Sequence, residues 1–267
     1  MSGGMLTQVI NNLSRTGEAI QKFDGLPANA IPIQRNIQSA INTLLPDIKQ
    51  MQRDVTTWGL KLEAQLDEKL AVLESLSPSE LTMFIRQSKE EITKVMSQVD
   101  KVKDRTKNTD NTVVDNNITL QRIIIDLQAT IAGLKSNLQG SQQKLDELNK
   151  KKYYFIALGI LGIPGLIAMA VLLSEAQSNV NSIERQISAQ QSDIRQQQSF
   201  ATQTVAFSQD LLELSNHMLK IGNAIEFVSN DIQKAEKNIS GGEAAQLTKL
   251  FFTAAKMSVK TLLVDAS

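Results

Sequence analysis

The feature that most restricts the fold is an apolar stretch from Tyr153 to Leu173, YYFIALGILGIPGLIAMAVLL, which holds 21 residues without a charge. Three lysines, Lys150, Lys151 and Lys152, stand directly before it, and Glu175 follows it. Charged residues make up 21% of the whole chain, so a core helix of this length would seldom lack them. A run this long and this apolar is a candidate for membrane insertion.

Two geometries fit this stretch. A straight helix of 21 residues would be roughly 32 Å long, enough to cross a hydrocarbon core of about 30 Å. A helical hairpin would have two arms, Tyr153–Leu161 and Leu166–Leu173, each about 12–14 Å long. Pro164 removes a helical hydrogen bond and disfavours helix in the residue before it. The segment Ile163-Pro164-Gly165 is therefore predicted to be the turn of a hairpin.

Three groups of residues in this stretch are predicted to act at a membrane. Apolar side chains would insert into lipid, driven by roughly 25 cal/mol per Å² of buried area: Phe155, Ile156, Leu158, Ile160, Leu161, Ile163, Leu166, Ile167, Met169, Val171, Leu172 and Leu173. Small residues and a proline would form the turn: Gly159, Gly162, Pro164 and Gly165. Amphipathic side chains would set the depth at the headgroups: Lys150, Lys151, Lys152, Tyr153 and Tyr154.

The remaining composition favours long helices over a globular core. Only 4% of the 267 residues are aromatic and five are proline. The 28 basic and 28 acidic side chains balance, which predicts no binding to nucleic acid. No cysteine is present, so disulfides and thiolate metal sites are excluded. The first residues lack the basic and apolar regions of a cleavable Sec signal, and we expect secretion by a route without one.

Apolar periodicity predicts helices over residues 5–23, 31–76, 78–152, 174–239 and 243–264. Ser77, Pro78 and Glu80 form a capping-box signature at the start of the third helix. Its seam is interrupted by polar residues that would either fix the register or weaken the bundle: Ser88, Thr106, Thr109 and Asn116. The last helix is expected to pack with a set of seven residues: Leu247, Leu250, Phe251, Ala254, Met257, Leu262 and Val264.

The two longest helices flank the apolar stretch and have similar lengths. A straight span would place them on opposite sides of the bilayer, where they could not pair, so we favour the hairpin. The predicted fold class is all-α, an elongated antiparallel bundle with a tail of about five helices. Residues 1–152 and 174–267 would form the tail, and residues 153–173 a small hydrophobic head at one end.

No residue pattern supports catalysis. The chain has one histidine, His217, which we expect to be partly exposed on the bundle. The pairs Glu90-Glu91 and Asp146-Glu147 occupy adjacent helix positions, which face different ways. Neither a glycine-rich phosphate loop nor a metal-ligand spacing is present. We therefore predict that the protein is not an enzyme and holds no cofactor or metal.

A cysteine-free helical chain with one central apolar segment between two very long helices resembles the cytolysin A superfamily of α-helical pore-forming toxins. The likeness covers the whole chain but rests on helix order, not on a motif. It implies a cytolytic, haemolytic component that inserts its head into target-cell membranes and assembles with itself and partner components into a lytic pore. Because no polar stripe interrupts Tyr153–Leu173, the head is similar to that of the small membrane-anchoring component of a tripartite toxin.

An apolar head of this size exceeds the few hundred Å² that soluble monomers normally expose. We therefore expect a homo-oligomer in solution whose heads mask one another. Two rival hypotheses remain. A secretion-system translocator would usually carry two separated apolar segments, and a coiled-coil membrane tether would use Tyr153–Leu173 as one transmembrane span.

Overall fold

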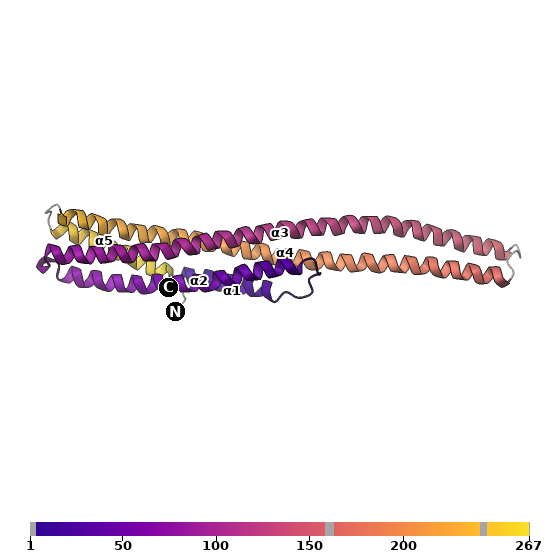
Figure 1. Cartoon of the computed structure of the whole chain (residues 1–267), viewed down its shortest axis with the longest axis horizontal. Helices are drawn as coiled ribbons and strands as arrows, with labels where there is room; N and C mark the ends of the chain where they lie inside the picture. Colours follow the sequence, from indigo (N-terminus) through magenta and orange to yellow (C-terminus); the bar gives the residue numbers. More distant parts are fainter. Residues whose placement is uncertain (1–3, 158–162, 241–244, 267) are drawn as a thin grey trace. The chain divides into compact units, whose positions relative to one another are not determined.

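The computed structural model describes residues 4–157, 163–240 and 245–266, with side chains described for 4–153, 168–239 and 246–266. These residues form long α-helices and one short 3-10 helix (Figure 1). In chain order they are α1 (Met5–Gln21), α2 (Ile31–Ala71), η1 (Leu73–Ser75), α3 (Pro78–Ala157), α4 (Ile163–Ser240) and α5 (Ala245–Ala266). No strand occurs within the described ranges, and the predicted all-α class is confirmed.

Both long helices reach further into the apolar stretch than the sequence predicts. Helix α3 continues to Ala157, past the predicted end at Lys152, and α4 begins at Ile163, eleven residues before Ser174. Conversely, α2 ends at Ala71, and the short helix η1 takes up part of the segment that was expected to continue it. The described parts of the predicted arms, residues 153–157 and 166–173, are therefore continuous with the long helices.

The chain forms two compact units, whose boundaries fall inside the long helices. The tail unit comprises Met1–Lys22, Ile33–Asn116 and Gln203–Ser267, and the hairpin unit comprises Phe23–Pro32 and Asn117–Thr202. This division differs from the predicted one at residues 152/153 and 173/174. The described residues of the predicted head, 153–157 and 163–173, belong to the hairpin unit.

Within the tail unit, α2, α3, α4 and α5 form a closed circle of neighbours. Each adjacent pair is joined by a side-chain contact. Lys61 Nζ on α2 lies 2.6 Å from Glu91 Oε1 on α3, and Lys89 Nζ on α3 lies 2.9 Å from Glu236 Oε2 on α4. Lys234 Nζ on α4 lies 5.7 Å from the centroid of the Phe251 ring on α5, and Lys260 Nζ on α5 lies 3.5 Å from Glu63 Oε1 on α2. Helix α1 adds hydrogen bonds from Thr16 to Asp210 on α4 and from Gln52 on α2 to Thr7. The tail unit is thus a helical bundle.

The polar residues in the seam of α3 are satisfied mainly by their own helix. Ser88 Oγ donates to the carbonyl oxygen of Phe84 at 2.9 Å, and Thr106 Oγ1 donates to that of Val102 at 2.8 Å. Both side chains are buried. A hydroxyl that bonds to its own helix does not select a partner, so the hydrogen bonds of Ser88 and Thr106 do not fix the register. Asn116 differs, because its Oδ1 accepts a hydrogen bond from Asn36 Nδ2 on α2 at 3.5 Å.

The capping box at the start of α3 is confirmed. Glu80 Oε2 accepts hydrogen bonds from the backbone N–H of Ser77 at 2.9 Å and from its hydroxyl at 2.6 Å. The backbone N–H of Glu80 donates back to Ser77 Oγ at 3.3 Å. The hydrogen bonds donated by Ser77 hold the pKa of Glu80 below its ordinary value.

Replacing Ser77 with alanine is expected to lower the free energy of unfolding by about 1 kcal/mol, the usual cost of losing an N-cap. A carboxyl whose folded-state pKa is lowered stabilises the fold above its unfolded-state pKa, and this contribution is lost as the pH falls through the folded-state value. The difference between the wild-type protein and Ser77→Ala should therefore shrink in acid. Urea unfolding at pH 7 and at pH 3, followed by Trp58 fluorescence, measures the free energy of unfolding of the two proteins. If Ser77→Ala lowers that free energy equally at the two pH values, this account is contradicted.

Helix α5 packs with a different face from the one predicted. Of the seven residues expected in the core, Leu262 is buried, whereas Leu250, Met257 and Val264 are exposed. The buried face consists of Thr248, Phe252, Ala255, Val259, Leu262 and Ala266. Apolar residues occur on both sides of α5, so periodicity alone did not identify the inner one.

Candidate membrane-inserting site

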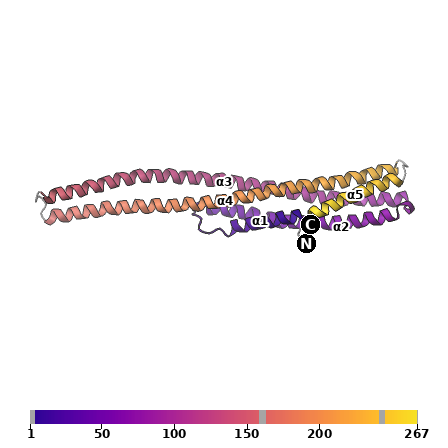
Figure 2. The same ribbon diagram turned by 180° about the vertical axis from the view of Figure 1, so that it is seen from behind.

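The hairpin unit holds the two ends of α3 and α4 that contain the apolar stretch. These helices lie side by side in both views (Figures 1 and 2). The colours along the chain show that the two helices run in opposite directions (Figure 1). The hairpin is therefore the geometry that the chain adopts, and the straight span is not.

An apolar cluster joins the two helices. Its buried members are Ile124 and Ile131 on α3 and Ile187 and Ile194 on α4. Partly buried residues pack against them: Leu127, Leu134, Leu138 and Ile183. The base of the hairpin unit adds an aromatic contact, with the Phe23 and Phe200 rings 5.3 Å apart.

Burial thins out beyond this cluster. Between Gly133 and Tyr153 on α3, every described side chain is half-buried or exposed. Between Ala168 and Gln186 on α4, Val180 is the one buried side chain among those described. Two helices that face only each other bury a single seam, so side chains on their outer faces stay in contact with the surroundings.

The predicted turn is placed differently. Pro164 and Gly165 are the second and third residues of α4, so the prediction of a turn over Ile163-Pro164-Gly165 is wrong. The first four N–H groups of a helix have no acceptor within the helix, and a proline there loses no hydrogen bond. The proline that suggested a break therefore fits the start of the helix.

Several predicted residues lie outside what the structure describes. Leu158, Gly159, Ile160, Leu161 and Gly162 lie outside the described residues altogether. For a second group the helical backbone is described but the side chain is not: Tyr154, Phe155, Ile156, Ile163, Pro164, Leu166 and Ile167. The role of both groups in membrane insertion stays a prediction.

The described flanks of the stretch present apolar and basic side chains at the surface. Tyr153 is 70% exposed, Val171 51% and Leu172 47%. Met169 and Leu173 are half-buried, Lys150 and Lys151 are exposed, and Lys152 is half-buried. Exposed apolar residues on one flank of the stretch, with exposed lysines and a tyrosine on the other, are the composition expected at a lipid headgroup boundary.

Two further observations concern the described residues only. No described helix is both long enough and apolar enough to span a bilayer. No group of three or more potential metal ligands occurs among them. His217, which was expected to be partly exposed, is buried in the tail unit.

Comparison with known proteins decides the family. The soluble AhlC protein of the tripartite α-pore-forming toxin AHL from Aeromonas hydrophila is 40% identical to this chain. The match covers 100% of this chain and 98% of AhlC, with a TM-score of 0.82. This chain belongs to the cytolysin A family of α-pore-forming toxins. It is a component of a toxin of this kind, as the resemblance in sequence pattern implied.

More distant cytolysin A toxins share the fold. The SmhB pore of the tripartite toxin Smh from Serratia marcescens is 13% identical, with 97% of each chain covered and a TM-score of 0.67. XaxA from Xenorhabdus nematophila is 12% identical, with 97% of this chain and 94% of XaxA covered and a TM-score of 0.62. No protein-family model and no curated protein sequence matches the chain.

Proposed function

We propose that this toxin component anchors in the target-cell membrane through residues 153–173 and assembles there, with further copies and with partner components, into a lytic pore. The observation that supports this most is the hairpin end, where apolar side chains are exposed on one flank of the stretch, and lysines and a tyrosine on the other. AhlC, which is 40% identical, belongs to a tripartite toxin and has also been solved as a triple head mutant. Action at a target cell requires that the protein leaves the cell that makes it.

The chemistry of the stretch favours an anchor over a channel wall. A segment that lines water needs a polar face along one side of its helices. Residues 153–173 carry no charge and no polar side chain apart from the two tyrosines at one end. This component would therefore bind the membrane first, and other surfaces, contributed by its partners, would line the lumen.

The same stretch predicts how the protein stays in solution before it meets a membrane. Contiguous apolar surface of this size promotes association, so several copies would cover one another's hairpin ends. Light scattering without detergent should show an oligomer at micromolar concentration. A monomer under these conditions would contradict the masking proposal, although not membrane anchoring.

Vesicle flotation and dye release, run on the same sample, test the proposed function. The expected result is that the protein floats with lipid vesicles and releases little dye on its own. Release by this component alone would mean that it forms a complete pore, and the anchoring role would be wrong. Failure to float would rule out the membrane role of residues 153–173.

A further inference from the structure

Three consecutive lysines, Lys150, Lys151 and Lys152, are the last charged residues of α3 before the apolar stretch, and we call them the lysine collar. They are the only charged residues of the sequence between positions 148 and 174. The chain as a whole carries 28 basic and 28 acidic side chains, so it has no net attraction for a charged surface. At the apolar end of α3, by contrast, all of the charge is positive.

Acidic residues lie farther from the apolar ends of the two helices than the collar does. Lys152 stands about 8 Å before the end of α3, and the preceding acidic residues, Asp146 and Glu147, stand about 8–9 Å farther back. On α4 the first charged residue is Glu175, about 18 Å from the start of the helix at Ile163. The field of an exposed charge falls off over about 8 Å at physiological ionic strength. A surface at the level of Lys152 is therefore influenced more strongly by the lysines than by the acidic residues.

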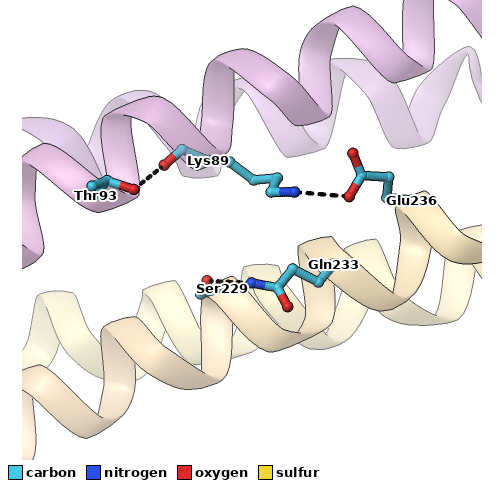
Figure 3. A network of polar contacts seen from close by, with 5 residues as sticks. All are labelled: Lys89, Thr93, Ser229, Gln233 and Glu236. Carbon is cyan, nitrogen blue, oxygen red and sulfur yellow. Dashed lines mark hydrogen bonds and ion pairs between the residues drawn. The ribbon is translucent and has the colours of Figure 1, made fainter.

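The collar has no acidic partner among the described side chains. Lys150 and Lys151 are exposed, Lys152 is half-buried, and none of the three lies within ion-pair distance of a described carboxylate. Two acidic residues stand one turn earlier on α3, at a spacing that permits ion pairs, but they form none with the collar. In the tail unit, by comparison, Lys89 on α3 reaches Glu236 on α4 at 2.9 Å (Figure 3). The positive charge of the collar is therefore available to an external partner.

A stabilising role at the helix end does not explain the collar. Basic residues stabilise a helix end by interacting with its dipole, and this effect is confined to the last turn. The last turn of α3 contains no basic residue. Successive residues of a helix point about 100° apart, so the three lysines spread around α3 instead of lining one pocket. Such a spread suits a continuous layer of negative charge better than a single small ligand.

We propose that the lysine collar binds the head groups of anionic phospholipids, and that this component thereby selects membranes whose accessible leaflet is negatively charged. The inference rests on the proposed function, because entry of residues 153–173 into lipid brings the collar to the head groups. Tyr153, which is 70% exposed, follows the collar directly and suits the same boundary. The apolar stretch would bind any fluid bilayer, and the collar would add a preference among bilayers.

The number of lysines sets the size of this preference. One lysine near a surface rich in anionic lipid strengthens binding about fivefold, so three would strengthen it about a hundredfold. The acidic residues one turn away reduce this figure, and we expect a preference of at least about tenfold. The preference should decline as the salt concentration rises, since salt screens exposed charges. The attraction is to charge, so phosphatidylglycerol should serve as well as phosphatidylserine.

Flotation at increasing lipid concentration tests the proposal on vesicles of phosphatidylcholine alone and of phosphatidylcholine mixed with an anionic lipid. Three variants are compared with the wild type. The first replaces the whole collar with glutamine, a good helix former without charge: Lys150→Gln, Lys151→Gln and Lys152→Gln. The second replaces the same residues with arginine and keeps the charge. The third is the matched control, which removes three exposed lysines of α3 in the tail unit: Lys101→Gln, Lys103→Gln and Lys107→Gln.

The wild type, the arginine variant and the control should prefer the anionic vesicles at least about tenfold, and the glutamine variant less than about threefold. Circular dichroism checks that the helix content of the variants is unchanged. Equal binding of the wild type to both kinds of vesicle would overturn the inference and leave membrane anchoring intact. Binding to neither would contradict the proposed function itself, and the inference with it.

Other outcomes also overturn the inference. A preference that persists in the glutamine variant would assign it to other basic residues, and an equal loss in the control would mean that total charge decides. A preference for phosphatidylserine that phosphatidylglycerol does not reproduce would mean recognition of head-group shape. Competition by inorganic phosphate at constant ionic strength would mean that the collar holds a free anion and not the membrane surface.

Discussion

Replacing Leu166 with aspartate is expected to lower the partition of this toxin into lipid vesicles by about a hundredfold. An ionised aspartate near the middle of the bilayer, where the tip of an inserted hairpin would lie, costs about 2.5–3.5 kcal/mol, and each 1.4 kcal/mol is a factor of about ten. Leu166 lies in the first turn of α4, where an acidic residue suits the helix dipole. The loss should therefore come from the lipid and not from unfolding.

Flotation over a range of lipid concentrations measures this partition, and circular dichroism checks that helix content is unchanged. Leu60→Asp is the matched control, because Leu60 is 56% exposed on α2 and lies outside the proposed anchor. If Leu166→Asp floats as well as the control, residues 153–173 are not the anchor. Ile163→Asp, at the first residue of α4, should give a loss of similar size.

Replacing Phe207 with alanine is expected to destabilise the tail unit by about 3–5 kcal/mol, because removing a buried aromatic ring leaves a cavity. Phe207 on α4 is fully buried. Phe227 on the same helix is 62% exposed and serves as the matched control. Phe227→Ala should change the free energy of unfolding by less than about 0.5 kcal/mol.

Trp58, the single tryptophan, reports on this unfolding, since it is buried on α2 in the same unit. Urea titrations of the two variants should separate clearly in their midpoints. Similar midpoints would mean that the bundle at Phe207 collapses around the missing ring, or that the tail unit does not unfold as one cooperative body.

The start of α3 could be predicted from the sequence because it carries a strong local cue. Ser77, Pro78 and Glu80 mark the start of α3, and the structure begins that helix at Pro78. The seam of α3 shows where such cues end, because Ile124 is the buried one of three adjacent isoleucines, residues 123–125. Steps of three or four residues fit more than one of them, and packing against α4 decides which one faces inward.

The candidate site shows the limit of local cues more sharply. Pro164 suggested a turn, yet it begins a helix, because a proline is compatible with the first turn as well as with a break. On α5, Met257 and Val264 were expected in the core and are exposed instead. Which apolar face points inward depends on neighbouring helices, and a single sequence does not contain that information.

The thinning of buried side chains along the hairpin unit has a consequence for how the unit opens. The free energy needed to separate α3 from α4 should fall from the isoleucine cluster toward Tyr153, since fewer buried contacts resist opening there. Amide hydrogens around Ile131 and Ile187 would then exchange slowly with solvent, and those near Leu148 and Glu175 much faster. The two helices would thus separate and pair again many times near the proposed anchor, while the rest of the toxin stays folded. Rearrangement at a membrane could therefore begin without unfolding the bundle.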